Sequence, residues 1–85
     1  MLNNEIVFSK HAKDAAQERK IPEEWILRTI DNPDHVKAGI DGNTHYIKAI
    51  SEREGRFLRV VINPYVLPKR IVTVFFDRRL KRERR

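Results

Sequence analysis

His11 is the first residue of this chain whose type and position could serve chemistry. It stands two residues after Ser9, a good N-cap, at the start of a predicted helix. The positive end of a helix dipole disfavours a charged imidazole, so we expect His11 to be able to accept a proton, for example from a ribose 2′-hydroxyl. The alternative is an ordinary surface histidine at a helix start.

A row of polar side chains is the second candidate. Alternation along the predicted strands puts Lys48, Arg59 and Thr73 on one face of a sheet, and the positions of the turns align them with His35. Two cations facing each other across strands repel, which makes sense if a phosphate lies between them, because arginine can bind two of its oxygens. The alternative is that long basic side chains only cover the apolar body of the sheet.

Aromatic residues flank this row. Tyr46, Phe57 and Phe75 share its predicted face and could offer stacking surfaces for bases, as the aromatic residues of single-stranded RNA readers do. This pattern, together with the two cations, predicts RNA as the partner.

Metal binding is not expected. The chain has no cysteine, and His11, His35 and His45 show no short ligand spacing. His45 is moreover predicted to share the apolar face of its strand. We therefore expect chemistry that needs no cofactor.

The elements that must position these residues follow from capping, turn and alternation signals. Helices are predicted over 10–20 and 22–31, with Pro22 opening the second. Four strands in meander order are predicted over 36–40, 43–50, 56–63 and 70–77, the first two joined by Asp41-Gly42. The predicted fold is α+β, with two N-terminal helices packed on one face of a four-stranded antiparallel sheet. Ile6–Phe8 is a candidate for one more short strand.

The two faces of the predicted sheet differ in polarity. The face expected beneath the helices is apolar and comprises Val36, Ile47, Ala49, Leu58, Val60, Ile62, Val72, Val74 and Phe76. The opposite face is expected to carry Tyr46, Lys48 and Ile50 from the second strand. A slip of one residue in the pairing would turn a strand over.

Length and charge bound the function. A chain of 85 residues makes one domain, which we place at 1–77. The segment 77–85 holds six lysines or arginines and two acidic residues, so it carries +4 of the net charge of +6. The tail 78–85, including Arg78 and Arg79, could attract nucleic acid, or it could be a solvated tail. No signal peptide or membrane span is recognised, so a cytoplasmic location is expected.

Three quoted segments carry a family resemblance. "HAKDAAQERKIPEEWILRTIDNP", "RFLRVVIN" and "RIVTVFF" together resemble the domain of unknown function 4258 family over about residues 9–77. That family is grouped with the RelE-like toxins of the barnase–EndoU–colicin–RelE ribonuclease fold. The resemblance implies a metal-independent ribonuclease, often a toxin beside an acidic antitoxin protein.

Carried over by position, the resemblance matches His11, Arg19 and Thr73. Lys20 stands where the family tends to have glycine, and "TVFF" replaces a "TVY" ending, so Tyr46 or Tyr65 would have to supply a phenol. In the expected site His11 is the general base, Arg59 and Lys48 stabilise the phosphate, and Arg19 and Thr73 position the substrate.

The expected function is cleavage of RNA by attack of a ribose 2′-hydroxyl on the phosphodiester. The alternative is a module without catalytic activity that binds RNA or a protein, such as an inactive relative or an antitoxin partner, through its basic tail. The oligomeric state is not readable from the sequence.

Overall fold

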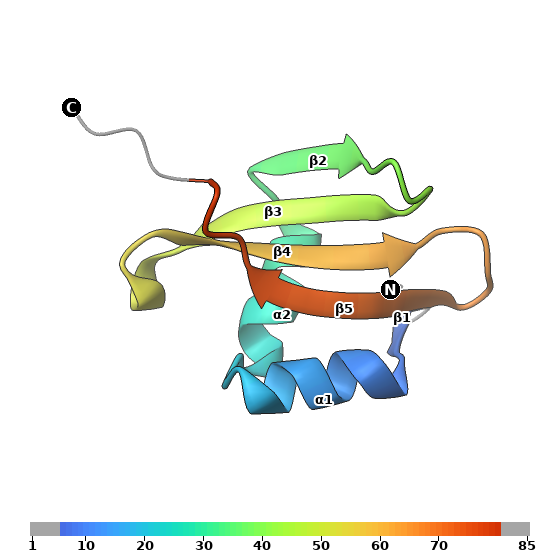
Figure 1. Ribbon diagram of the computed structural model, residues 1–85, viewed down its shortest axis with the longest axis horizontal. Helices are drawn as coiled ribbons and strands as arrows, with labels where there is room; N and C mark the ends of the chain where they lie inside the picture. Colours follow the sequence, from blue (N-terminus) through green and yellow to red (C-terminus); the bar gives the residue numbers. More distant parts are fainter. Residues whose placement is uncertain (1–5, 81–85) are drawn as a thin grey trace.

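The chain folds into a layer of helices on one side of a β-sheet, as a computed structural model describes for residues 6–80 (Figure 1). The elements in chain order are β1 (Ile6–Phe8), α1 (Lys10–Glu18), α2 (Glu23–Asp31), β2 (His35–Ala38), β3 (Thr44–Ile50), the 3₁₀ helix η2 (Ser51–Arg53), β4 (Arg56–Asn63) and β5 (Lys69–Phe76). None of the helices in this part of the chain is long and apolar enough to cross a membrane. Most of the predicted basic tail, from residue 81 onward, lies outside the described residues.

The sheet has five strands in the order β1-β5-β4-β3-β2. β1 runs parallel to β5, with Ile6 opposite Lys69, whereas the other neighbouring strands are antiparallel. The predicted α+β class and the candidate strand at Ile6–Phe8 are confirmed, and the predicted sheet of four antiparallel strands is corrected to a mixed sheet of five. β1 is only three residues long and pairs with the far end of the sequence, so turn signals could not reveal its partner.

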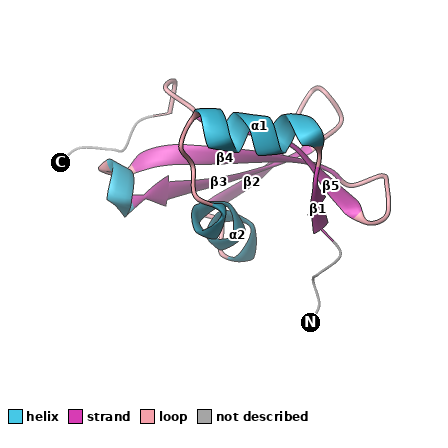
Figure 2. Cartoon of the chain, turned by 90° about the horizontal axis from the view of Figure 1, so that it is seen from below, coloured by secondary structure: helices cyan, strands magenta, loops and turns pink. Residues whose placement is uncertain are grey.

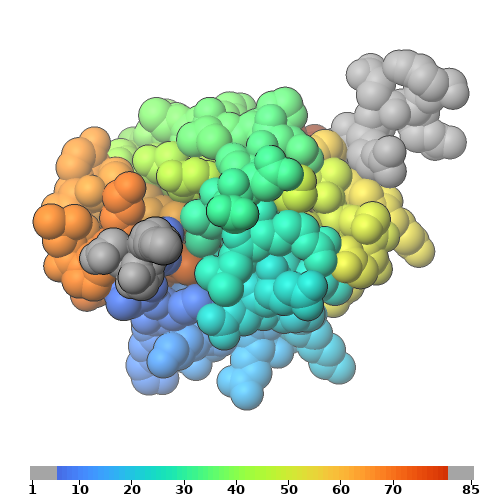
Figure 3. Space-filling model, turned by 180° about the vertical axis from the view of Figure 1, so that it is seen from behind, coloured from blue at the N-terminus to red at the C-terminus, as the bar shows by residue number. Residues whose placement is uncertain are grey.

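Both helices cover the same face of the sheet. α1 packs mainly against β5, and α2 packs against β3 and β4. In the view from below, α1 is seen lengthwise and α2 nearly end-on (Figure 2). Seen from behind, the blue and cyan helices cover the middle and lower part of the molecule (Figure 3). The core beneath them contains small helix residues, Ala12 and Ala15, and the fully buried Leu58 and Val74 from the sheet. Short alanine side chains allow α1 to lie close to β5. The other face of the sheet is left free of helices.

The junction between the helices is fixed by a Schellman motif. Ile21 donates its N–H to the carbonyl of Ala16 at 2.8 Å, and Lys20 donates to the carbonyl of Gln17 at 3.2 Å. Lys20 takes the left-handed conformation with φ of 57°, the conformation that favours glycine. Ile21, which follows it, is buried in the core. The junction therefore has the shape that a glycine would give, although a lysine occupies it.

β3 is turned over relative to the prediction. Ile47 lies opposite Arg59, and Lys48 lies opposite Leu58, so the predicted pairing of Lys48 with Arg59 is wrong by one residue. The turn sets this register, because η2 and the left-handed Glu54 pair Ile50 with Arg56. As a result Ile47 and Ala49 lie on the uncovered face, whereas Ile50 belongs to the core.

β5 contains an irregularity that also changes a predicted face. Val61 pairs with Thr73 and Ile62 with Ile71, so Val72 is an extra residue in the ladder. This bulge turns Ile71 into the core, where it is fully buried, although simple alternation predicted it on the opposite face. Val72 accordingly loses its predicted place on the covered face. Thr73 and Phe75, beyond the bulge, keep their predicted side.

Candidate functional site

The uncovered face of the sheet gathers polar and aromatic side chains in two rows across β2, β3, β4 and β5. One row is His35, Ile47, Arg59 and Phe75; the next is Lys37, His45, Val61 and Thr73. Ile47 and Val61 are 1% and 3% exposed, although neither belongs to the cluster under the helices. Since no described helix covers this face, the surrounding side chains of the rows must shield these two residues from water.

Arg59 is held at the centre of this face by Asp77. Its Nε and Nη2 lie 2.9 Å and 2.8 Å from Oδ2 of Asp77. The side chains of the pair are 11% and 3% exposed. Asp77 follows β5 directly, and its N–H donates to the carbonyl of Phe57 at 2.9 Å, so the sheet itself fixes the carboxylate beside Arg59. This geometry leaves Nη1 of Arg59 free to point along the face.

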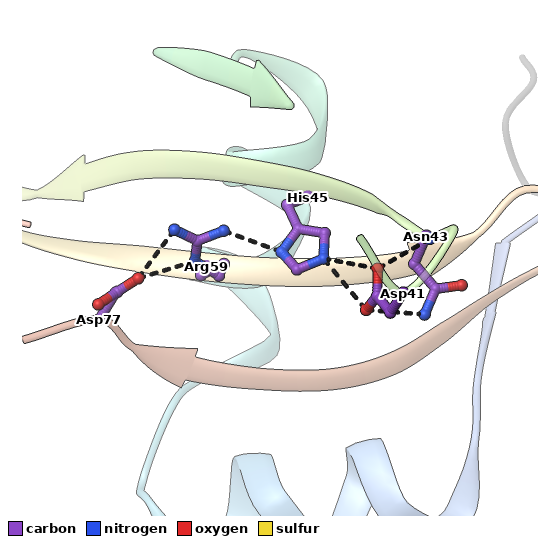
Figure 4. A network of polar contacts seen from close by, with 5 residues as sticks. All are labelled: Asp41, Asn43, His45, Arg59 and Asp77. Atoms are coloured by element: carbon purple, nitrogen blue, oxygen red, sulfur yellow. Dashed lines mark hydrogen bonds and ion pairs between the residues drawn. The ribbon is translucent and has the colours of Figure 1, made fainter. Parts of the chain in front are cut away.

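His45 lies at that free end of Arg59. Nη1 of Arg59 is 2.9 Å from Nδ1 of His45, and Nε2 of His45 is 3.3 Å from each carboxylate oxygen of Asp41 (Figure 4). A guanidinium nitrogen can only donate, so Nδ1 must present its lone pair, and the ring proton must sit on Nε2 and face Asp41. The lone pair of the imidazole is therefore directed at a cation, and its N–H is directed at a carboxylate.

Both carboxylates of the network stay ionised. The backbone N–H of Asn43 lowers the pKa of Asp41 most, and hydrogen bonds from His45 and the Asn43 side chain lower it further, against a smaller opposing effect of burial. Burial raises the pKa of Asp77, but hydrogen bonds from Arg79 and Arg59 outweigh it, and the net shift is downward. The four side chains therefore form one hydrogen-bonded chain in the order Asp41, His45, Arg59 and Asp77.

The family is settled by a match over most of the chain. The model of the family described as domain of unknown function (DUF4258) matches residues 8–76. The chain belongs to this family. The comparisons with curated proteins and with solved structures each gave no match. The resemblance noted in the sequence is thus confirmed at the level of the DUF4258 family, whose description names no activity.

Several residues predicted for the site of this DUF4258 chain do lie on the uncovered face. His35, Phe57, Arg59, Thr73 and Phe75 share it, which matches the faces predicted for them. Arg78 and Arg79 are exposed in the turn after β5, and the backbone N–H of Arg79 donates to Oδ1 of Asp77 at 2.9 Å.

Lys48 and Tyr46 do not join them. Both lie on the helix-covered face, where Lys48 is opposite Leu58 and Tyr46 is opposite Val60. Tyr46 packs against the core. The ammonium of Lys48 lies 3.7 Å from Oδ1 of Asp34. The predicted phosphate clamp of Lys48 with Arg59 is therefore wrong, because the slipped register puts the two cations on opposite sides of the sheet.

His11 and Arg19 lie on the helix layer. His11 is exposed near the start of α1, and Arg19 is the exposed C-cap residue of the same helix. Among residues 6–80 the side chain of neither makes a hydrogen bond or ion pair. α1 covers the face opposite to Arg59, so the predicted meeting of His11 with Arg59 does not occur in this fold.

His45 is the residue that the sequence argument missed. It was assigned to the apolar face because Ile47 and Ala49 share its parity on β3. A turn centred on Asp41 pairs Lys37 with His45, as observed, whereas a turn centred between Asp41 and Gly42 pairs Lys37 with Tyr46. Within residues 6–80 no group of three or more histidine, cysteine, aspartate or glutamate side chains is arranged to hold a metal ion.

Proposed function

We propose that this DUF4258 chain is a metal-independent endoribonuclease of the RelE-like type that acts on the uncovered face of its sheet. The observation that carries the proposal is the 2.9 Å approach of Nδ1 of His45 to Nη1 of Arg59. A basic nitrogen beside a cation is what phosphodiester cleavage by a 2′-hydroxyl needs, because one group accepts the proton and the other binds the phosphate. His45 takes the role that the sequence suggested for His11.

In the proposed reaction a substrate phosphate enters between the two side chains. Nδ1 of His45 takes the proton of the ribose 2′-hydroxyl while its oxygen forms a bond to phosphorus and the bond to the 5′-oxygen breaks. The products are a 2′,3′-cyclic phosphate and a 5′-hydroxyl, whose proton the imidazolium returns. Asp41 stabilises that imidazolium, as an orienting carboxylate does in other histidine-dependent sites. Arg59, held by Asp77, stabilises the charge that develops on the phosphate.

The surroundings of the pair support RNA as the substrate. Phe57 and Phe75 are half-buried on the same face and offer ring surfaces to unpaired bases. Lys37 on β2 and Arg70 on β5 are exposed, and Arg79 after β5 has a side chain that is 83% exposed. Such cations attract the phosphates of a single strand across the sheet.

The direct test is incubation of the purified protein with total RNA in the presence of EDTA. We expect fragments that end in a cyclic phosphate, and we expect His45→Gln to lose cleavage at least about a hundredfold, the contribution typical of general-base catalysis. His11→Gln, on the helix layer, is the matched control and should cleave at the wild-type rate. Equal cleavage by His45→Gln, or loss of cleavage in His11→Gln alone, would overturn the assignment.

A second candidate function is RNA binding without cleavage. The observation that favours it is that the hydrogen bonds of the network are satisfied within the protein. Asp77 pairs with Arg59, and both ring nitrogens of His45 are hydrogen-bonded to protein side chains. Binding would then use the exposed cations and the aromatic side chains alone. RNA affinity that is retained while no fragments form, in wild type and His45→Gln alike, would identify this function.

A further inference from the structure

Two loops lie at the same end of the sheet. The turn 39–43 joins β2 to β3, and the segment 64–68 joins β4 to β5. Thr44 at the start of β3 lies opposite Ile62 near the end of β4, so both loops project from one end. They are the loops at the right of Figure 1. We call this part of the molecule, residues 39–43 and 64–70, the loop end.

The loop end carries the most exposed apolar side chains of the described chain. Ile40 is 110% exposed, Leu67 is 88% exposed and Tyr65 is 81% exposed. The next most exposed large hydrophobic residue is Val36 at 54%, and the helix layer contributes only Leu27 at 47%. Side chains as exposed as the first three bury almost no area, so the stability of the fold does not explain why they are apolar.

The place of Ile40 in its turn adds to this observation. Gly42 donates its N–H to the carbonyl of Gly39 at 3.0 Å, so Ile40 and Asp41 are the central residues of a tight turn. Such positions favour glycine, proline, asparagine, aspartate and serine, which fit the backbone or hydrogen-bond to it. An isoleucine there does neither, and it projects into solvent. Clustered exposed apolar side chains of this kind mark contact sites for a partner.

Cations lie at the base of the apolar side chains. Lys69 and Arg70 begin β5 directly after the loop, and both are exposed. Asp41 is the one acidic residue of the loop end, and its carboxylate accepts hydrogen bonds from the backbone and side chain of Asn43. The loop end is therefore apolar at its tips and positively charged at its base. An anionic lipid surface complements both properties, because its headgroups attract cations and its acyl chains accept apolar side chains.

We propose that the loop end binds the surface of an anionic lipid bilayer, with Ile40, Tyr65 and Leu67 inserted at the boundary of headgroups and acyl chains. Tyrosine is enriched at this boundary in membrane proteins. Lys69 and Arg70 then face the anionic headgroups. A fluid bilayer accommodates separate protruding side chains, whereas a protein partner must provide a surface of matching shape.

The bound orientation leaves the uncovered face accessible. Arg59 is four residues before the end of β4, or about 13 Å along the strand from the loop end. Its network with His45 therefore stays in solvent while the loop end contacts lipid. The inference goes beyond the proposed function and does not depend on it.

Sedimentation with sucrose-loaded vesicles tests the proposal. The full chain should sediment with vesicles of phosphatidylcholine and phosphatidylserine in a ratio of about seven to three, and far less with phosphatidylcholine alone. Ile40→Ser/Leu67→Ser should weaken binding to the anionic vesicles at least about tenfold, because two apolar side chains no longer enter the bilayer. Lys69→Gln should weaken it about fivefold. Leu27→Ser is the matched control on the helix layer and should bind like wild type.

A tryptophan placed at the tip reports insertion directly. In Leu67→Trp, lipids brominated on their acyl chains should quench the added emission. In wild type the emission of Trp25, which lies on α2, should stay unquenched. Added emission that persists in bound Leu67→Trp, or equal sedimentation of wild type and Ile40→Ser/Leu67→Ser, overturns the proposal, since charge alone would then hold the protein to lipid. Absence of wild type from the anionic vesicles also overturns it and assigns the apolar tips to a protein partner.

Controls separate this inference from folding and from the proposed nuclease. Circular dichroism should show every variant folded, because each substituted side chain of the loop end is exposed. RNA cleavage in solution by Ile40→Ser/Leu67→Ser should equal that of wild type. Lipid binding without any cleavage therefore refutes only the nuclease, and cleavage without lipid binding refutes only this inference.

Discussion

Nη1 of Arg59 lies 2.9 Å from Nδ1 of His45, and the same guanidinium is bound on its other edge by Asp77. The arginine therefore links the imidazole of His45 on β3 to the buried carboxylate of Asp77 at the end of β5. Because the arginine can only donate, protonation of His45 at Nδ1 requires this contact to break. The three side chains are therefore linked by direct contacts. The effect of substitutions on the uncovered face can be measured separately on the free energy of unfolding and on RNA affinity.

Arg59→Leu should lower the free energy of unfolding by about 3–5 kcal/mol, because it leaves the carboxylate of Asp77 buried without its cation. The measurement is urea unfolding followed by circular dichroism at neutral pH. The double variant Arg59→Leu/Asp77→Leu is the control, and it should lose less than Arg59→Leu alone, since the unpaired charge is gone. Losses that simply add would show that the two side chains do not interact.

Acid should destabilise the protein partly through Asp77. Its pKa in the folded protein lies below the ordinary value of 3.8, so the unfolded chain takes up a proton first as the pH falls. The stabilising contribution is therefore complete above about pH 5 and is lost progressively as the pH drops through 3.8 towards the folded value. The difference in unfolding free energy between pH 7 and pH 3 should be smaller in Asp77→Asn than in wild type.

The comparison of wild type with Asp77→Asn isolates the contribution of Asp77 to the acid loss of stability. Glu52, whose pKa is lowered to about 2 chiefly by hydrogen bonds from Arg28, contributes to the same acid loss in both proteins and cancels. Asp31→Asn, a change at an exposed residue of α2, should leave the wild-type pH dependence intact. An equal loss in wild type and Asp77→Asn would remove Asp77 from the explanation.

Lys20→Gly should stabilise the protein by about 1 kcal/mol. Lys20 has a φ of 57°, a conformation that costs a residue with a Cβ atom roughly 1–2 kcal/mol and costs glycine little. Thermal unfolding measures the effect. Lys13→Gly, an exposed position inside α1, is the opposite control and should destabilise by about 1 kcal/mol. A fall in stability for Lys20→Gly would mean that the lysine side chain itself holds the junction.

RNA binding should depend on salt through the cations of the uncovered face. Lys37→Gln should reduce the slope of log affinity against log salt concentration by about 0.7, the value for one phosphate of a single strand. Fluorescence anisotropy across a salt series gives the slope. Lys13→Gln removes the same charge from the helix layer and should leave the slope unchanged. Equal slopes for the two variants would place the RNA elsewhere on the molecule.

Local signals located most of the elements. Ser9 caps α1, with its side chain accepting from the N–H of Ala12. Pro22, predicted as the first residue of the second helix, is the N-cap of α2, one residue before the helix begins. Asp41-Gly42 lies in the turn between β2 and β3. These signals depend on neighbours within a few residues, so the sequence contains all the information that they need.

The register of β3 could not be read in the same way. Tyr46 and Ile50 make one of its faces apolar, and Ile47 and Ala49 make the other apolar as well, so alternation alone does not choose between them. The choice depends on the left-handed conformation at Glu54 in the following turn. Because the observed register differs by one residue from the predicted one, His45 lies on the same face of the sheet as Arg59, and Lys48 lies on the opposite face.

The Arg59–Asp77 pair has a consequence for the order of events during translation. A growing chain shorter than 77 residues lacks the carboxylate that holds Arg59, and one shorter than 69 residues lacks the described partner of β1. Because β1 pairs with β5, this edge of the sheet cannot form before residues 69–76 have been synthesised. A nascent polypeptide therefore cannot complete the network of Asp41, His45, Arg59 and Asp77 until its synthesis has passed residue 77.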